Sequence, residues 1–65
     1  MGEQRDLISI VIPVYNEEAA IGEDLDTILE TMEASGRDYE VIVVDDGSTD
    51  GSAEIVRRRP QVRLI

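Results

Sequence analysis

The sequence predicts an α/β fold with a parallel sheet and the element order β-α-β-α-β. Three short apolar runs rich in β-branched residues begin at Leu7, Tyr39 and Val62. A long segment with helical spacing of apolar residues separates the first two runs, and a shorter segment ending before Pro60 separates the last two. Both segments are long enough to carry the crossover that parallel strands require.

The first strand is expected at residues 7–15, which are almost continuously apolar. Pro13 has no N–H to donate to a neighbouring strand. We therefore expect ladder hydrogen bonding to stop at Pro13 and the chain to turn out of the sheet there. Tyr15 and Asn16 would then lie at the carboxyl end of the strand.

The first helix is expected to begin at Asn16, a favourable N-cap, and to end at Gly36 in a left-handed cap. Glu17 and Glu18 follow Asn16, where the helix dipole favours negative charge. Gly22 lies inside the helix at a cost of about 1 kcal/mol relative to alanine, and close packing on a strand would explain it. One stripe of the helix is apolar, and it consists of Ile21, Leu25, Ile28, Leu29 and Met32.

The second strand is expected at residues 39–45, followed by a loop at residues 47–51. A short helix at residues 52–59 would stop at Pro60, and a third strand would start at residues 62–65. Residues 41–44 are apolar on both alternating faces, so the middle strand expects cover above and below.

Composition limits the function classes that the chain can serve. It has 65 residues and a net charge of −9, with 15 acidic residues against 6 arginines, and it lacks cysteine and histidine. Such a charge repels a phosphate backbone, so we expect no nucleic-acid partner. Disulfides and thiolate metal sites are excluded.

No apolar run approaches the roughly 20 residues of a membrane span. We expect the segment to face the cytoplasm, on the cytoplasmic side of a membrane if sequence outside these residues provides an anchor. Sixty-five residues fall below the usual domain size, and an apolar run restarts just before Ile65. We therefore expect the N-terminal part of a larger domain.

Asp45 and Asp46 follow the second strand directly, at the edge where open α/β sheets bind ligands. Capping and Asx-type turns could account for Ser48, Thr49 and Asp50 completely. They account less well for two adjacent carboxylates that repel each other. A ligand or a cation that accepts one of the pair would offset that repulsion, so ligand binding is the favoured interpretation for at least one of them.

Pro13, Tyr15 and Glu17 surround the end of the first strand, which a parallel pairing places beside the end of the second. Each has a structural alternative: a strand terminator, a half-buried ring and a partner for the helix dipole. Tyr15 and Asp46 could nevertheless form one pocket, because a flat ring beside a carboxylate suits a purine or a pyrimidine. A further cluster, Arg57, Arg58 and Arg59, favours a solvated helix end over a phosphate site.

Three α/β classes fit the sequence poorly. A dinucleotide-binding unit needs G-x-G-x-x-G after its first strand, whereas residues 13–18 contain no glycine. A P-loop needs a lysine, and the chain has none. A receiver domain of a two-component system would place the strand before its acidic pair first in the fold, whereas here a complete strand and helix precede it.

Residues 10–17, IVIPVYNE, and residues 40–52, EVIVVDDGSTDGS, resemble the N-terminal half of the nucleotide-binding region of family 2 glycosyltransferases. The resemblance covers residues 7–65 and is greatest to the dolichyl- or polyprenyl-phosphate hexosyltransferase branch. It implies a Rossmann-like GT-A fold with strand order 3-2-1 at one side of a larger sheet. Right-handed crossovers in that order would put both helices on the same face and leave the other face bare.

The same resemblance implies inverting hexosyl transfer from a UDP- or GDP-sugar to a lipid-phosphate acceptor, such as a polyprenyl phosphate, or to a saccharide. Residues of the family that line the pocket for the donor's base and ribose match Pro13, Tyr15, Glu17, Val44 and Asp46. The family's D-x-D motif, which holds Mg²⁺ or Mn²⁺ on the donor diphosphate, comes later, as does its catalytic base. No catalytic residue and no metal ligand is therefore expected in this chain.

Two hypotheses remain. In the first, residues 1–65 are the N-terminal nucleotide-sugar-binding segment of a glycosyltransferase domain that is incomplete at its C-terminus and inactive alone. In the second, they form a non-catalytic nucleotide-binding or interaction fragment that ends at Ile65. Downstream sequence containing a D-x-D motif would separate the two.

Overall fold

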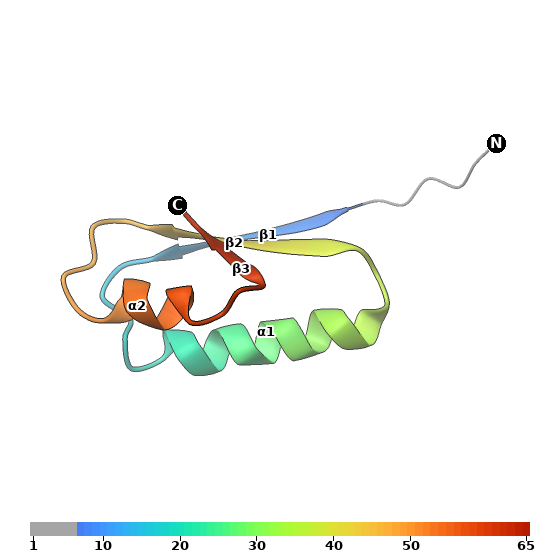
Figure 1. Cartoon of the computed structure of the whole chain (residues 1–65), viewed down its shortest axis with the longest axis horizontal. Coiled ribbons are helices and arrows are strands. Elements are labelled where there is room, and N and C mark those ends of the chain that lie inside the picture. The colour runs from blue at the N-terminus through green and yellow to red at the C-terminus, as the bar shows by residue number, and fades with distance from the viewer. Residues whose placement is uncertain (1–6) are drawn as a thin grey trace.

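The computed structural model describes residues 7–65, which fold as a parallel three-stranded sheet with two helices (Figure 1). The strand order is β1-β2-β3, and both strand pairings are parallel. The predicted α/β class and the predicted strand order are therefore confirmed. The elements are β1 (Ile8–Val14), α1 (Ile21–Ser35), β2 (Tyr39–Asp45), α2 (Ser52–Arg57) and β3 (Val62–Leu64).

Both helices pack on one face of the sheet (Figure 1), as the strand order predicts. Val41 and Val43 of β2 point into this layer and are almost completely buried. The opposite face is bare within residues 7–65: Val11 is 58% exposed and Val44 is 37% exposed. The apolar core between sheet and helices consists of Val14, Ile21, Leu25, Leu29, Val41, Val43, Val56 and Val62.

β1 continues through Pro13, so the prediction that the ladder stops there was wrong. Pro13 is the register partner of Val44, and the Asp46 N–H donates to the Val14 carbonyl at 2.9 Å. Successive residues of a parallel strand direct their backbone groups alternately to either side. Because Val14 faces β2, the Pro13 nitrogen faces the other side, where no bond to β2 is lost.

α1 begins at Ile21, five residues later than Asn16, so the predicted N-cap was also wrong. Asn16 has a left-handed backbone with φ of 50°. The chain makes a turn before the helix, in which the Ile21 N–H donates to the Glu17 carbonyl at 2.8 Å. At the other end, Gly36 has φ of 70° and its N–H donates to the Glu33 carbonyl, which confirms the left-handed cap.

Gly22 packs closely against side chains of the second helix and of Arg59, and its nearest neighbours are not in a strand. A Cβ there would lie 3.2 Å from Nη2 of Arg59 and 3.3 Å from Cγ2 of Ile55. The Arg59 guanidinium bridges the two helices, because Nε and Nη2 donate to the Asp26 carboxylate at 2.8 and 3.0 Å. It also donates to the carbonyls of Ile55 and Gly22. Arg59 is therefore not part of a solvated helix end, and α2 already ends at Arg57.

Within residues 7–65, neither helix combines the length and the apolar character needed to cross a membrane.

Candidate functional site

Two loops meet at the carboxyl ends of β1 and β2, at one end of the molecule (Figure 1). The first covers residues 15–20 and leads into α1, and the second covers residues 46–51 and leads into α2. They are side by side because β1 and β2 are parallel neighbours. Most of the residues singled out in the sequence lie in these loops or in the strand residues just before them.

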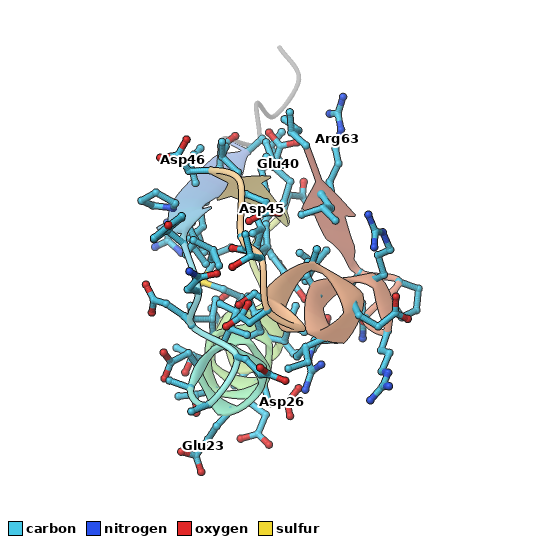
Figure 2. All side chains as sticks on the ribbon, turned by 90° about the vertical axis from the view of Figure 1, so that its left-hand side faces the viewer. Glu23, Asp26, Glu40, Asp45, Asp46 and Arg63 are labelled. Atoms are coloured by element: carbon cyan, nitrogen blue, oxygen red, sulfur yellow. The ribbon has the colours of Figure 1, made fainter. Side chains whose placement is uncertain are left out.

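The two adjacent carboxylates at the end of β2 have different surroundings. Asp45 Oδ1 accepts a hydrogen bond from the Ser48 N–H at 3.1 Å, and Gly47 makes the intervening turn with φ of 78°. The Asp46 carboxylate makes no hydrogen bond or ion pair with any residue in 7–65. Figure 2 shows Asp45 on the helix side of the sheet and Asp46 on the opposite side. Asp45 therefore stabilises the loop, whereas Asp46 is available to a ligand.

The end of β1 supplies apolar and aromatic surface next to Asp46. Pro13 is exposed and lies in register with Val44. Tyr15 is exposed and follows Val14, whose carbonyl accepts the Asp46 N–H. The fold thus brings Pro13, Tyr15, Val44 and Asp46 to one edge. Glu17 lies further along the first loop and is exposed.

Asn16 joins the first loop to the second. Its side-chain Oδ1 accepts hydrogen bonds from the N–H groups of Thr49 and Asp50, at 2.8 and 3.3 Å. In the opposite direction, its own N–H donates to the Ser48 hydroxyl at 2.9 Å. A left-handed backbone is uncommon outside glycine, but asparagine adopts it more readily than most residues. The sequence signal of an N-cap was real, but the groups that Asn16 satisfies belong to the other loop.

Ser52, the first residue of α2, makes a second connection beneath Asn16. It is fully buried, and its hydroxyl accepts the Glu17 N–H at 2.8 Å and donates to Asp50 Oδ1 at 2.6 Å. The other oxygen of Asp50 accepts the Glu18 N–H at 3.1 Å. The bond from the Ser52 hydroxyl, together with the N–H groups of Ser52 and Glu18, lowers the pKa of Asp50. Ser48 and Asp50 therefore cap backbone groups, as the structural interpretation allowed, and two of these groups, the N–H groups of Asn16 and Glu18, lie across the gap between the loops. The Thr49 side chain caps no backbone group among residues 7–65, because its hydroxyl donates to Asn16 Oδ1.

A depression of about 600 Å³ lies beside β3, where its lining includes Arg57, Arg59 and Ile65. None of the five residues predicted to bind a nucleotide lines it. Its two arginines already have partners, because Arg57 pairs with Glu54 at 3.7 Å and Arg59 binds Asp26. The depression therefore offers less to an anionic ligand than its lining suggests.

No group of three or more acidic side chains within residues 7–65 is arranged to hold a metal ion. Asp45 and Asp46 cannot act as a pair of ligands in this arrangement, because they point to opposite sides of the sheet (Figure 2). The described residues therefore do not fit a divalent cation.

One family profile and several known proteins resemble this chain in sequence. A family profile described as glycosyl transferase family 2 matches residues 9–65. The chain is similar to the undecaprenyl-phosphate 4-deoxy-4-formamido-L-arabinose transferase of Edwardsiella ictaluri, with 44% identity over 61 residues, or 89% of this chain. The transferase of the same name from Shewanella sediminis is 51% identical over 51 residues, or 78% of this chain. The uncharacterized glycosyltransferase YkcC of Bacillus subtilis is 44% identical over 61 residues, or 88% of this chain.

The chain spans only a small part of these relatives, between 15% and 19% of their length. No solved structure matches the chain.

Proposed function

Because the chain belongs to glycosyltransferase family 2, we propose that residues 7–65 bind the nucleotide part of a UDP- or GDP-sugar at the carboxyl edge of the sheet. The observation that carries the proposal is the contrast between Asp45 and Asp46. One carboxylate is used by its own loop, and the other is unpartnered among residues 7–65, next to the end of β1. A free carboxylate at this edge is the feature that a nucleobase can use.

The side chains around Asp46 suit a base and a ribose. Uracil and guanine each carry a ring N–H that the Asp46 carboxylate can accept, and hydrogen bonds to a charged group are stronger than neutral ones. The exposed ring of Tyr15 offers a flat surface for stacking. Pro13 and Val44 supply apolar contact beneath the base, and Glu17 supplies a carboxylate for the ribose hydroxyls.

In this proposal the sugar is transferred with inversion to a polyprenyl phosphate or a related acceptor. The names of two relatives support a lipid-phosphate acceptor, since both are undecaprenyl-phosphate sugar transferases. The catalytic base and the D-x-D ligands of a divalent cation, Mg²⁺ or Mn²⁺, would lie outside these 65 residues. The reaction would take place on the cytoplasmic face of a membrane, to which other parts of the protein attach.

The proposal is tested by calorimetric titration of the intact natural protein with UDP, GDP, ADP and CDP. Adenine and cytosine have no ring N–H on the edge that pairs, so we expect UDP or GDP to bind at least tenfold more tightly than ADP and CDP. Pyrophosphate serves as the control for binding through phosphate alone. Equal affinity for the four nucleotides, or no affinity for any of them, would refute recognition of the base by Asp46.

A further inference from the structure

We propose that Asn16 is a positioning residue, which holds the loop carrying Tyr15 and Glu17 against the loop that follows Asp46. This inference rests on the proposed nucleotide site. It assigns to Asn16 no contact with the nucleotide itself. Its role is exerted through the Ser48 hydroxyl and the backbone N–H groups of Thr49 and Asp50.

The bonds of Asn16 are reciprocal, and they join segments more than 30 residues apart. The Asn16 N–H donates to the Ser48 hydroxyl, while Oδ1 of the same residue accepts from the N–H groups of Thr49 and Asp50. The Thr49 hydroxyl also donates to Oδ1, at 3.5 Å, so one residue bonds to four groups of the second loop with both its backbone and its side chain. No other residue of the first loop bonds with both its backbone and its side chain to the second loop within the described chain.

The backbone conformation of Asn16 also favours asparagine at this position. Its φ of 50° lies in the left-handed region, where a side chain other than that of glycine, asparagine or aspartate is unfavourable. Glycine could adopt this conformation but would have no acceptor for the second loop. Asparagine supplies both the conformation and the carbonyl oxygen.

The position of Asn16 connects these bonds to the proposed site. Tyr15 precedes it, Glu17 follows it, and Asp46 is tied to the same edge by its N–H bond to the Val14 carbonyl. Tyr15 and Asp46 must be held at one spacing if a base is to contact both. Loss of the Asn16 carbonyl would let the first loop populate other conformations. The apparent dissociation constant for the nucleotide would then rise, in inverse proportion to the fraction of molecules whose first loop is in the binding conformation.

The test compares nucleotide affinity in the intact natural protein and in Asn16→Gly, which keeps the left-handed backbone and removes the acceptor. We expect the dissociation constant for UDP or GDP, whichever the parent protein binds, to rise about tenfold. Amide hydrogen exchange without nucleotide provides the second readout, and we expect protection of the Thr49 and Asp50 amides to fall. A weaker affinity with unchanged protection would mean that Asn16 contacts the ligand directly, which would overturn the proposal.

Gly36→Ala is the matched control for a purely structural effect. Gly36 also has a left-handed backbone, with φ of 70°, but it lies at the far end of α1. Alanine there destabilises the fold, and we expect it to lower the melting temperature while leaving nucleotide affinity within twofold of the parent. If Gly36→Ala weakens nucleotide binding as much as Asn16→Gly does, the effect of Asn16 is only one of stability, and the proposal fails.

A second pair of variants decides the matter if Asn16→Gly does not fold. Ser48→Ala removes the hydroxyl that accepts the Asn16 N–H, and Ser48→Thr keeps a hydroxyl. We expect Ser48→Ala to bind nucleotide about threefold more weakly and Ser48→Thr to restore affinity. Parent-like affinity in Ser48→Ala would overturn the positioning role alone. Failure of the parent protein to bind either nucleotide would instead refute the proposed function, and the positioning role with it.

Discussion

Replacement of Asp46 by asparagine is the most informative single change, because it removes a charge without altering the shape of the side chain. The carboxylate has no partner within residues 7–65, so the substitution breaks no bond of the described fold. Asparagine can still turn an oxygen to the base, but its NH₂ group competes for the same position and would face the ring N–H. We therefore expect weaker nucleotide binding with an unchanged free energy of unfolding.

The magnitude follows from the kind of bond that is lost. A hydrogen bond to a charged group contributes about 1.5–3 kcal/mol, which corresponds to roughly ten- to a hundredfold in the dissociation constant. Asp45→Asn is the matched control, because it removes the same charge from the neighbouring residue. It keeps an oxygen for the Ser48 N–H, so it should change neither affinity nor stability much. Asp45→Ala removes that acceptor and should cost about 0.5–1.5 kcal/mol of stability.

Calorimetric titration of the intact natural protein with UDP and GDP, together with urea unfolding of each variant, measures both quantities. The reasoning is refuted if Asp46→Asn binds the nucleotide as tightly as the parent protein does. It is also refuted if Asp45→Asn weakens binding equally, because the effect would then follow from net charge and not from the position of Asp46.

Three other predictions concern stability. Arg59→Met should lower the free energy of unfolding by about 1–3 kcal/mol, because the carbonyls of Ile55 and Gly22 each lose a bond of about 0.5–1.5 kcal/mol. In urea unfolding, the control variant Arg58→Met, at an exposed neighbouring residue, should change this free energy by less than about 0.5 kcal/mol. Equal losses in the two variants would contradict the bridging role of Arg59. The folded state lowers the pKa of Asp50, so the stability that the ionised carboxylate contributes is present above the unfolded pKa of about 3.9 and is lost as the pH falls through the folded pKa. Hydrogen-exchange protection of the Glu18 amide should therefore decrease below about pH 4. Protection that does not change with pH would count against the bond between Asp50 and the Glu18 N–H. Finally, the isolated 65-residue chain should associate or melt without cooperativity because one sheet face is bare; a sharp thermal transition of a monomer in calorimetry would show otherwise.

The order and type of the elements could be predicted from the sequence because their signals are local. A continuous apolar run rich in β-branched residues placed β2 at residues 39–45, as observed, and the spacing of apolar residues identified the buried stripe of α1. Gly36 was predicted correctly for the same reason, since a left-handed cap depends on the residues just before it. The strand order came from the resemblance to the family.

The errors arose where the surroundings of a residue are set by distant segments of the chain. Asn16 has the local properties of an N-cap, but its acceptor is used by a loop 33 residues away. Gly22 and Arg59 meet across the two helices, a contact that no local pattern encodes. A proline in a central strand would interrupt the hydrogen bonds to its neighbours, but the Pro13 nitrogen faces the side of β1 that is away from β2. Sequence reasoning expected the candidate binding residues at the carboxyl edge of the sheet, but it did not identify Ser52, whose buried hydroxyl accepts the Glu17 N–H.

The central claim is that a nucleobase binds at the carboxyl edge of the sheet, against Asp46. A crystal structure of the intact natural protein with UDP or GDP bound would test it most directly. We predict that the ring N–H of the base lies within hydrogen-bond distance of the Asp46 carboxylate, with Tyr15 against the face of the base. A nucleotide seated instead in the depression beside β3, between Arg57 and Arg59, with Asp46 still without a partner, would contradict the account.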